Sequence, residues 1–139
     1  MNDYFEKILQ ADVYEVAKKT PLEKAHNLSN TLKNEIFLKR EDLQDVFSFK
    51  IRGAYNKMSK LTNSQLSQGV ITSSAGNHAQ GVAMSAQKLN CQATILMPIT
   101  TPLVKVNAVK NLKAKVILFG DNYDETYKEA IRISRERNL

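Results

Sequence analysis

The sequence predicts an α/β fold with three layers, α-β-α, in which helices cover both sides of a small parallel sheet. The first observation behind this is that, from residue 69 onward, short apolar runs alternate with segments whose apolar residues recur at helical spacing. The second is that helices of about 10–15 residues between such runs favour parallel strands with right-handed crossovers. The third is composition, because 139 residues with 42% hydrophobic and 24% charged residues suit one ordinary globular domain.

The N-terminal part predicts a mixture of helical and extended elements. Apolar residues at helical spacing predict one helix over residues 4–18, and Pro21 breaks that pattern. Leu28 and Leu32 predict a short helix, and the apolar-rich run at residues 35–41 predicts a strand.

A further helix is predicted to follow Ser48, because a serine hydroxyl can cap a helix N-terminus. Ile51, Tyr55 and Met58 then recur on one face at helical spacing. Lys50 therefore stands in the first turn of this helix.

The second half of the chain predicts three strands and three helices. Thr101 and Pro102 are typical of an N-cap and a first helical residue. The last helix reaches Leu139 with no strand after it, so we expect the sequence to be the N-terminal piece of a longer protein. The predicted strands are 69–73, 93–98 and 115–119, and the predicted helices are 77–89, 102–111 and 123–137.

Charge and cysteine content exclude several classes of function. The net charge of +6 permits nucleic-acid binding, but most lysines are scattered and carry no interleaved aromatic set, so we expect a solvated surface. The single cysteine excludes an internal disulfide, and the two histidines lie too far apart to indicate a metal site. With neither a long apolar run nor a secretory signal, the expectation is a cytoplasmic protein without a membrane span.

The stretch SSAGNHAQG, residues 73–81, predicts an anion site at the carboxyl end of a strand. Gly76 permits a tight turn, and the first amides of the helix from Asn77 point outward. The alternative is an ordinary strand-to-helix turn. A nucleotide phosphate loop is excluded, because Val82 and Ala83 stand where that motif needs a lysine and a serine or threonine.

Lys50 is either a solvated lysine or a reactive amine. It lies between Phe49 and Ile51 in a first helical turn, where positive charge is electrostatically disfavoured. Packing against those apolar neighbours would favour the neutral amine, which can act as nucleophile and base.

Two long segments carry a resemblance to a known family. FLKREDLQDVFSFKIRGAYNKM, residues 37–58, and GVITSSAGNHAQGVA, residues 69–83, resemble the pyridoxal-phosphate enzymes of the tryptophan synthase β-like fold. Within that family they are similar to the biosynthetic threonine deaminases, also called threonine dehydratases or threonine ammonia-lyases. The family motif Ser-Phe-Lys-x-Arg-Gly-Ala is matched without departure at residues 48–54.

The resemblance implies pyridoxal 5′-phosphate as cofactor and three residues that contact it. Lys50 would hold the cofactor as a Schiff base, yield it to the substrate amine and then take the α-proton. Phe49 would pack beside the cofactor ring, and Asn77 would hydrogen-bond its 3-oxygen. Lys50 is thus the catalytic residue that the resemblance implies.

The same resemblance implies that the anion loop binds a substrate carboxylate. Ala75 stands where serine racemases of this fold tend to carry a serine that serves as a second acid-base group. Because alanine cannot protonate a substrate, elimination is expected rather than racemisation. The implied substrate-binding residues are Ser74, Ala75, Gly76, Asn77 and His78.

The implied reaction converts L-threonine to 2-oxobutanoate and ammonia, the first step of isoleucine biosynthesis. Residues 1–46 would begin the large cofactor domain and residues 47–139 would form most of the small domain. A phosphate-binding glycine loop, the rest of the large domain and a regulatory domain would lie beyond residue 139, so a fragment inactive alone is expected. The full-length protein would be a homo-oligomer. The alternatives are a catabolic threonine or serine dehydratase, a serine racemase-like enzyme, or a non-catalytic module of the same fold.

Overall fold

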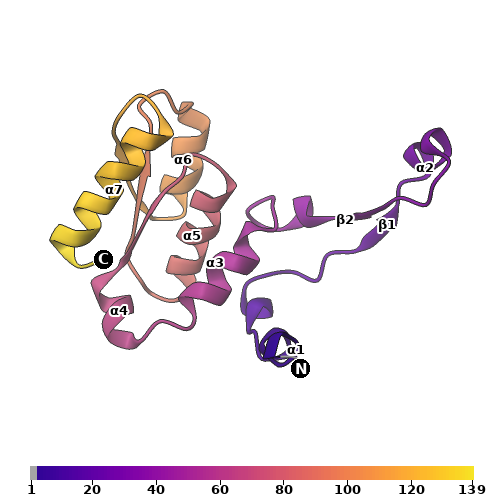
Figure 1. The fold of residues 1–139 in the computed structure, drawn as a ribbon, viewed down its shortest axis with the longest axis horizontal. Helices are drawn as coiled ribbons and strands as arrows, with labels where there is room; N and C mark the ends of the chain where they lie inside the picture. The colour runs from indigo at the N-terminus through magenta and orange to yellow at the C-terminus, as the bar shows by residue number, and fades with distance from the viewer. Residues whose placement is uncertain (1–2) are drawn as a thin grey trace.

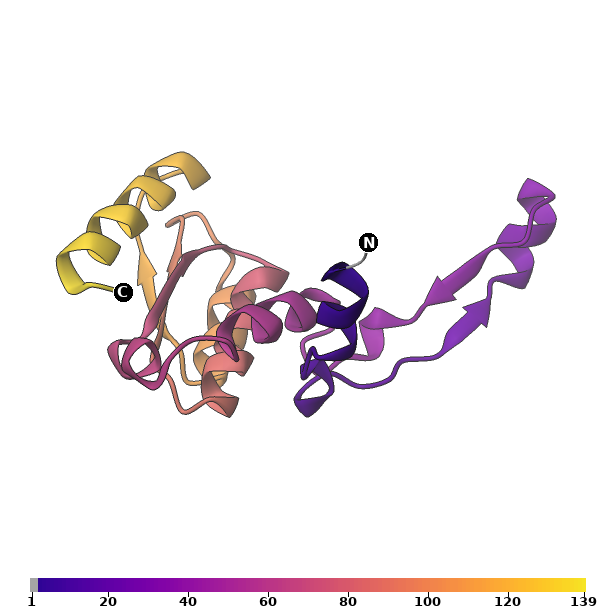
Figure 2. The same ribbon diagram turned by 60° about the horizontal axis from the view of Figure 1, so that its bottom comes forward.

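The computed structural model describes residues 3–139 and consists of an extended arm and an α/β body (Figure 1). In the arm, β1 (Leu22–Lys24) and β2 (Phe37–Lys39) pair antiparallel. α2 (His26–Leu32) lies at the tip of the arm, away from the body (Figures 1 and 2). All residues of β1 and β2 are exposed, so the arm contributes nothing to the core of the body.

The body contains the predicted parallel sheet. β3 (Val70–Ser73), β4 (Ala93–Met97) and β5 (Lys115–Leu118) lie in the order β3-β4-β5, and both pairs are parallel. All five residues of the central strand β4 are buried. The prediction of three parallel strands is therefore confirmed, with strand ends that differ from the predicted ones by one residue.

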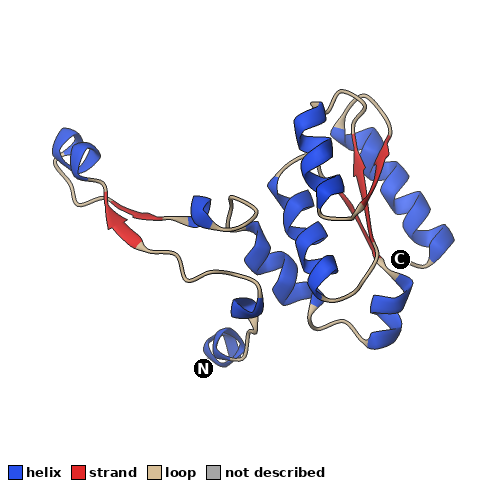
Figure 3. Cartoon of the chain, turned by 180° about the vertical axis from the view of Figure 1, so that it is seen from behind, coloured by secondary structure: helices blue, strands red, loops and turns tan. Residues whose placement is uncertain are grey.

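Helices cover both faces of this sheet, which confirms the three-layer prediction. α5 (Asn77–Lys88) and α6 (Leu103–Asn111) pack on one face, with α3 (Lys50–Met58) against α5, and α7 (Tyr123–Arg137) covers the other (Figure 3). Side chains of β4 alternate accordingly. Ile95 and Met97 join the cluster of α5 and α6, whereas Leu96 joins Ala130 and Ile133 of α7.

The single helix predicted over residues 4–18 is wrong. α1 (Asp3–Leu9) ends early, and a separate 3₁₀ turn, η1 (Val13–Glu15), follows it. None of the residues of α1 is buried, and Ile8 and Leu9 are exposed. Most of the stability of a protein helix comes from tertiary packing. Because α1 has no buried residue, no such packing extends it into one helix up to residue 18.

Two predicted helix caps are also wrong. α3 begins at Lys50 with Phe49 as N-cap, and α6 begins at Leu103 with Pro102 as N-cap; neither cap makes a side-chain hydrogen bond. The predicted cap residues Ser48 and Thr101 are instead buried, and the hydroxyl oxygen of each lacks a hydrogen-bond partner among residues 3–139. The chain turns at Phe47, whose φ is 56°, and Ser48 lies inside the turn.

Of the remaining elements, four agree with the predicted helices and strands and two were not predicted. α2, α5 and α7 match predicted helices, and β2 is the centre of the predicted strand 35–41, which continues as the 3₁₀ turn η2 (Glu41–Leu43). β1 and α4 (Asn63–Gln68) were missed. Among residues 3–139, every helix is too short or too polar to cross a bilayer. The division into domains at residue 46 stays a prediction.

Candidate active site

Lys50 lies beside α5, because Gly81 lets α3 approach that helix closely. A Cβ at Gly81 would lie 3.0 Å from the carbonyl carbon and oxygen of Lys50 and 3.2 Å from the nitrogen of Ile51. Real Cβ atoms essentially never come much closer, so a side chain at residue 81 would push α3 away. Since Gly81 is about one turn from the start of α5, the backbone of Lys50 passes near that start.

The loop between β3 and α5 has the open geometry predicted for it. The Ser74 N–H donates to the carbonyl of Leu96 on β4 (3.0 Å), which fixes the loop at the carboxyl end of the sheet. The Gly76 N–H donates to the Ser74 hydroxyl over a long 3.4 Å. Gly76 is the N-cap of α5 and makes no side-chain cap, so the first amides of the helix are free of a capping oxygen. The side chains of Asn77 and His78 are exposed.

Electrostatics connect this loop with Lys50. Partial desolvation of the imidazole lowers the pKa of the His78 side chain below its usual value, and the positive charge of Lys50 lowers it further. The His78 imidazole is therefore held in its neutral form, and the two side chains are near enough to interact. The structure thus brings together Lys50 and the loop 74–78, which are separate motifs in the sequence.

The immediate neighbours of Lys50 differ from the prediction. Ile51 is buried with Ala17 and Val46 and does not pack against the lysine amine. Phe49 is 58% exposed, and the Lys50 Nζ lies 5.0 Å from its ring centroid. The prediction that Lys50 is held against apolar neighbours is wrong in this respect, because the helix turns Ile51 into the core and leaves Lys50 exposed.

The sequence did not predict a polar network that joins Arg52, two residues after Lys50, with Glu41 and Thr20. The guanidinium of Arg52 donates two hydrogen bonds to the carboxylate of Glu41, from Nε and Nη2, at 2.8 Å each. The Arg52 hydrogen bonds lower the pKa of Glu41 to about 2, assisted by the hydroxyl of Thr20. The only sequence signal was Arg52 itself, two residues after Lys50 in the matched motif.

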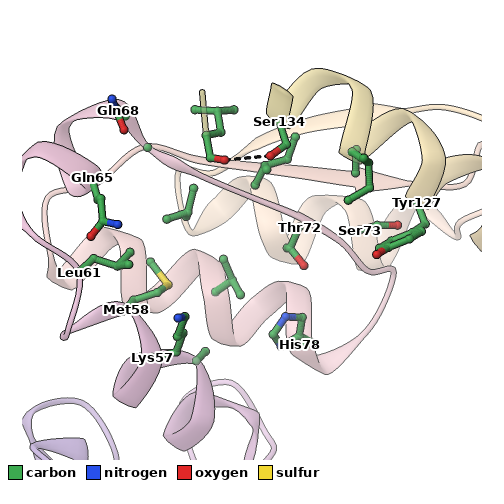
Figure 4. A pocket seen from close by; sticks show the side chains of 18 of the residues that line it. Lys57, Met58, Leu61, Gln65, Gln68, Thr72, Ser73, His78, Tyr127 and Ser134 are labelled. Carbon is green, nitrogen blue, oxygen red and sulfur yellow. Dashed lines mark hydrogen bonds between the residues drawn. The ribbon is translucent and has the colours of Figure 1, made fainter. Parts of the chain in front are cut away.

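A cleft of about 690 Å³ runs along the outer edge of β3 and does not include Lys50. Its walls come from α3 and α4 on one side and from α7 on the other (Figure 4). Of the predicted site residues, only His78 lines it. Ser73 lines it too, and its hydroxyl oxygen is buried without a hydrogen-bond partner among residues 3–139. This cleft is therefore adjacent to the Lys50 site, through His78, but distinct from it.

Comparisons with known proteins show the family of this chain. The model of the family "Pyridoxal-phosphate dependent enzyme" matches residues 13–139. "Threonine dehydratase 1 biosynthetic, chloroplastic" of Solanum lycopersicum is 62% identical over 123 residues, which cover 88% of this chain and 20% of that protein. The chain thus spans about a fifth of the length of this relative.

Solved structures give the same relationship. The processed form of threonine deaminase isoform 2 from Solanum lycopersicum superposes with a TM-score of 0.93 at 51% identity, over 98% of this chain and 40% of that one. Maize serine racemase superposes with a TM-score of 0.90 at 29% identity, over 96% of this chain and 41% of that one. The tryptophan synthase β-like fold predicted from the sequence is confirmed. Because the family model covers nearly the whole chain, from the turn η1 to the last residue, the chain belongs to the family of pyridoxal-phosphate dependent enzymes.

Proposed function

We propose that this chain contributes Lys50 and the residues around it to an active site. That site converts L-threonine to 2-oxobutanoate and ammonia, as the first step of isoleucine synthesis. The observation that carries the proposal is that the backbone of Lys50, whose side chain is exposed, lies against α5 close to the uncapped first turn of that helix. The names of the relatives, threonine dehydratase and threonine deaminase, support this choice of substrate.

The residues at this site fit the cofactor of the family. An exposed primary amine, an exposed aromatic ring 5.0 Å from it and the exposed carboxamide of Asn77 can offer a covalent anchor, a packing surface and a hydrogen-bond donor. Pyridoxal phosphate, when bound, supplies an electron sink for the bonds at the substrate α-carbon. Lys50, Phe49 and Asn77 are the residues that would hold it.

The loop 74–78 is suited to a carboxylate. The amides at the start of α5 are uncapped and carry the positive end of the helix dipole, which attracts an anion. Within the described residues 3–139, the Ser74 hydroxyl accepts a single long hydrogen bond, so its proton remains available for donation. The neutral imidazole of His78 adds no charge, and His78 contributes through its backbone amide. These groups would fix the α-carbon of an amino acid relative to Lys50.

Lys50 would then remove the proton from the α-carbon. Ala75, in the same loop, has no group that could return a proton from the other face, so the β-hydroxyl would leave as water. The enamine product would tautomerise to an imine, and a water molecule would hydrolyse that imine to 2-oxobutanoate and ammonia. A serine at residue 75 would instead favour a racemase. The alternative substrate L-serine, as in a catabolic dehydratase, uses the same elimination.

The test is a chimera in which residues 13–139 replace the matching segment of the tomato dehydratase. We expect it to release 2-oxobutanoate from L-threonine, and Lys50→Ala to abolish that release. Lys57→Ala, on the same helix and also exposed, is the matched control and should keep the activity. Normal turnover in the Lys50→Ala chimera would refute the proposal, and faster turnover of L-serine would favour the catabolic alternative.

The cytoplasmic location and the homo-oligomeric state stay predictions from the sequence. The tomato relative is named chloroplastic, and that description belongs to the tomato protein.

A further inference from the structure

We propose that Glu41 is a positioning residue for Lys50, which it aligns with the start of α5 through its pairing with Arg52. This inference rests on the proposed role of Lys50 as the reactive amine. Glu41 itself touches neither a substrate nor the cofactor site.

The carboxylate of Glu41 accepts hydrogen bonds from Arg52, from Thr20 and, over a longer 3.3 Å, from the side-chain amide of Gln44. Arg52 donates to it from Nε and Nη2, both at 2.8 Å, and the hydroxyl of Thr20 donates at 2.6 Å. Such a forked pair fixes the plane of the guanidinium as well as its distance. The Nη2 of Arg52 also donates to the carbonyl of Lys18 at 3.1 Å, so the arginine is tied to two separate segments.

Gln44 closes the network from the other side. Its side-chain amide donates to the carbonyl of Lys18 (2.9 Å) and accepts from the N–H of the same residue (2.8 Å). Gln44 is only 2% exposed, so these bonds are sheltered from water. Residues 18–20, residues 41–44 and the first turn of α3 are thereby joined as one unit.

The network of Arg52, Glu41 and Gln44, here called the clamp, holds the side of α3 opposite to Lys50. Residues two apart on an α-helix are separated by about 200° around its axis, so the side chains of Lys50 and Arg52 leave in opposite directions. α3 has no side-chain N-cap, and the Ser48 hydroxyl makes no hydrogen bond to any residue from 3 to 139. The pair of Arg52 and Glu41 therefore does what the missing cap would do, and it sets the rotation of the first turn.

Burial separates this pair from the other ion pairs of residues 3–139. The side chains of Arg52 and Glu41 are 24% and 14% exposed, and in every other such pair at least one partner is more than a third exposed. A sheltered, forked pair holds its geometry, whereas exposed pairs are weak and screened by salt. Two further titratable side chains reach this network among residues 3–139: the ring centroid of Tyr14 lies 5.5 Å from the guanidinium carbon, and the ammonium of Lys39 donates to the carbonyl of Thr20.

The first test measures where pyridoxal phosphate attaches to the chain. The protein is mixed with the cofactor, treated with borohydride and digested, and the labelled lysines are identified by mass spectrometry. In Glu41→Gln we expect the share of Lys50 side chains that carry label to fall by about tenfold, because small displacements of a reacting group cost about that much or more. The share on Lys57 should stay constant. Glu35→Gln, which removes the exposed pair with Lys24, is the matched control and should change neither share.

The second test needs no cofactor. The charge of Lys50 helps to lower the pKa of His78, so an NMR titration of His78 reports where Lys50 lies. Lys50→Gln should raise the pKa of His78, and Glu41→Gln should raise it as well. Glu35→Gln should leave it unchanged. If Glu41→Gln does not fold, Arg52→Lys replaces it, because a lysine keeps the charge but cannot form the fork.

The outcomes separate this inference from the proposed function. A lower melting temperature in Glu41→Gln, with the Lys50 share and the His78 titration as in the wild type, would make Glu41 merely structural and overturn the inference. If the wild-type chain shows no preference for Lys50 over Lys57, the proposed role of Lys50 fails instead. The His78 titration then still decides whether Glu41 places the Lys50 side chain.

Discussion

Gly81 is the residue on which the closeness of α3 and α5 depends. We expect Gly81→Ala to lower the free energy of unfolding by about 1–3 kcal/mol, because the added methyl group meets backbone atoms of Lys50 and Ile51 that cannot move aside alone. Urea denaturation followed by circular dichroism measures the change.

Gly53→Ala is the control for helix propensity. Gly53 lies inside α3, and a Cβ there would meet no atom within 4 Å. This substitution should raise the free energy of unfolding by about 0.5–1 kcal/mol. Equal effects of the two substitutions would mean that the contact at Gly81 does not limit the approach of the helices.

The pair of Glu41 and Arg52 gives a pH dependence of known sign. Folding lowers the pKa of Glu41 from 4.5 to about 2, so its contribution to stability is fully present above the higher value and is lost as the pH falls through the lower one. The difference in unfolding free energy between the wild type and Glu41→Gln should therefore be constant near neutral pH and shrink in acid. Urea titrations at several pH values measure it, and a difference that grows in acid would contradict the assignment.

The sequence could predict Lys50 and the loop 74–78 because each belongs to a contiguous motif. Glu41 and Arg52 are 11 residues apart, and Lys18 and Gln44 are 26 apart, without a shared periodicity. Such a network forms only when the segments pack together, so no local sequence pattern predicts it. The exposed position of Lys50 was missed for the same reason, because the rotation of the first helical turn is set by tertiary contacts.

At the scale of elements, α4 was not predicted because it lacks an apolar face. Its N-cap, however, has a recognisable sequence pattern. Thr62 and Gln65 form a capping box, with the Gln65 N–H donating to the Thr62 hydroxyl and the Thr62 N–H donating to the Gln65 side chain. The buried strands and α7 were found because their apolar patterns are strong. The helix predicted over residues 4–18 failed because exposed apolar residues mimic such a pattern.

We expect Thr62→Ala to destabilise α4 by about 1 kcal/mol. Because α4 contains no buried residue, the loss should be local. Hydrogen exchange of amides 63–68 should then become several-fold faster, as about 1.4 kcal/mol corresponds to tenfold. Ser64→Ala, an exposed change in the same helix, should leave exchange unchanged or slow it. Equal acceleration in both variants would show that the capping box is not responsible.

For the whole molecule, the exposure of the Lys50 site bears on cofactor affinity. Lys50, Phe49 and Asn77 are all exposed, and Lys50 does not line the large cleft, so water competes for every contact that these residues can make. We expect residues 1–139 to bind pyridoxal phosphate weakly and to release no 2-oxobutanoate from L-threonine. Absorbance titration and a deamination assay with added cofactor test this. Stoichiometric tight binding with turnover would contradict it.

The cleft beside β3 lies against one edge of the parallel sheet. The N–H groups of Val70 and Ser74 donate toward β4, so by the alternation of a strand the backbone groups of Ile71 and Ser73 face the cleft. α7 crosses β4 and β3 and brings Leu139 next to Gly69, at the amino end of β3. Both polar and apolar side chains of α3, α4 and α7 flank this edge of the sheet. The cleft therefore exposes the backbone hydrogen-bonding groups of an edge strand, which are the groups through which an extended polypeptide can pair with a sheet.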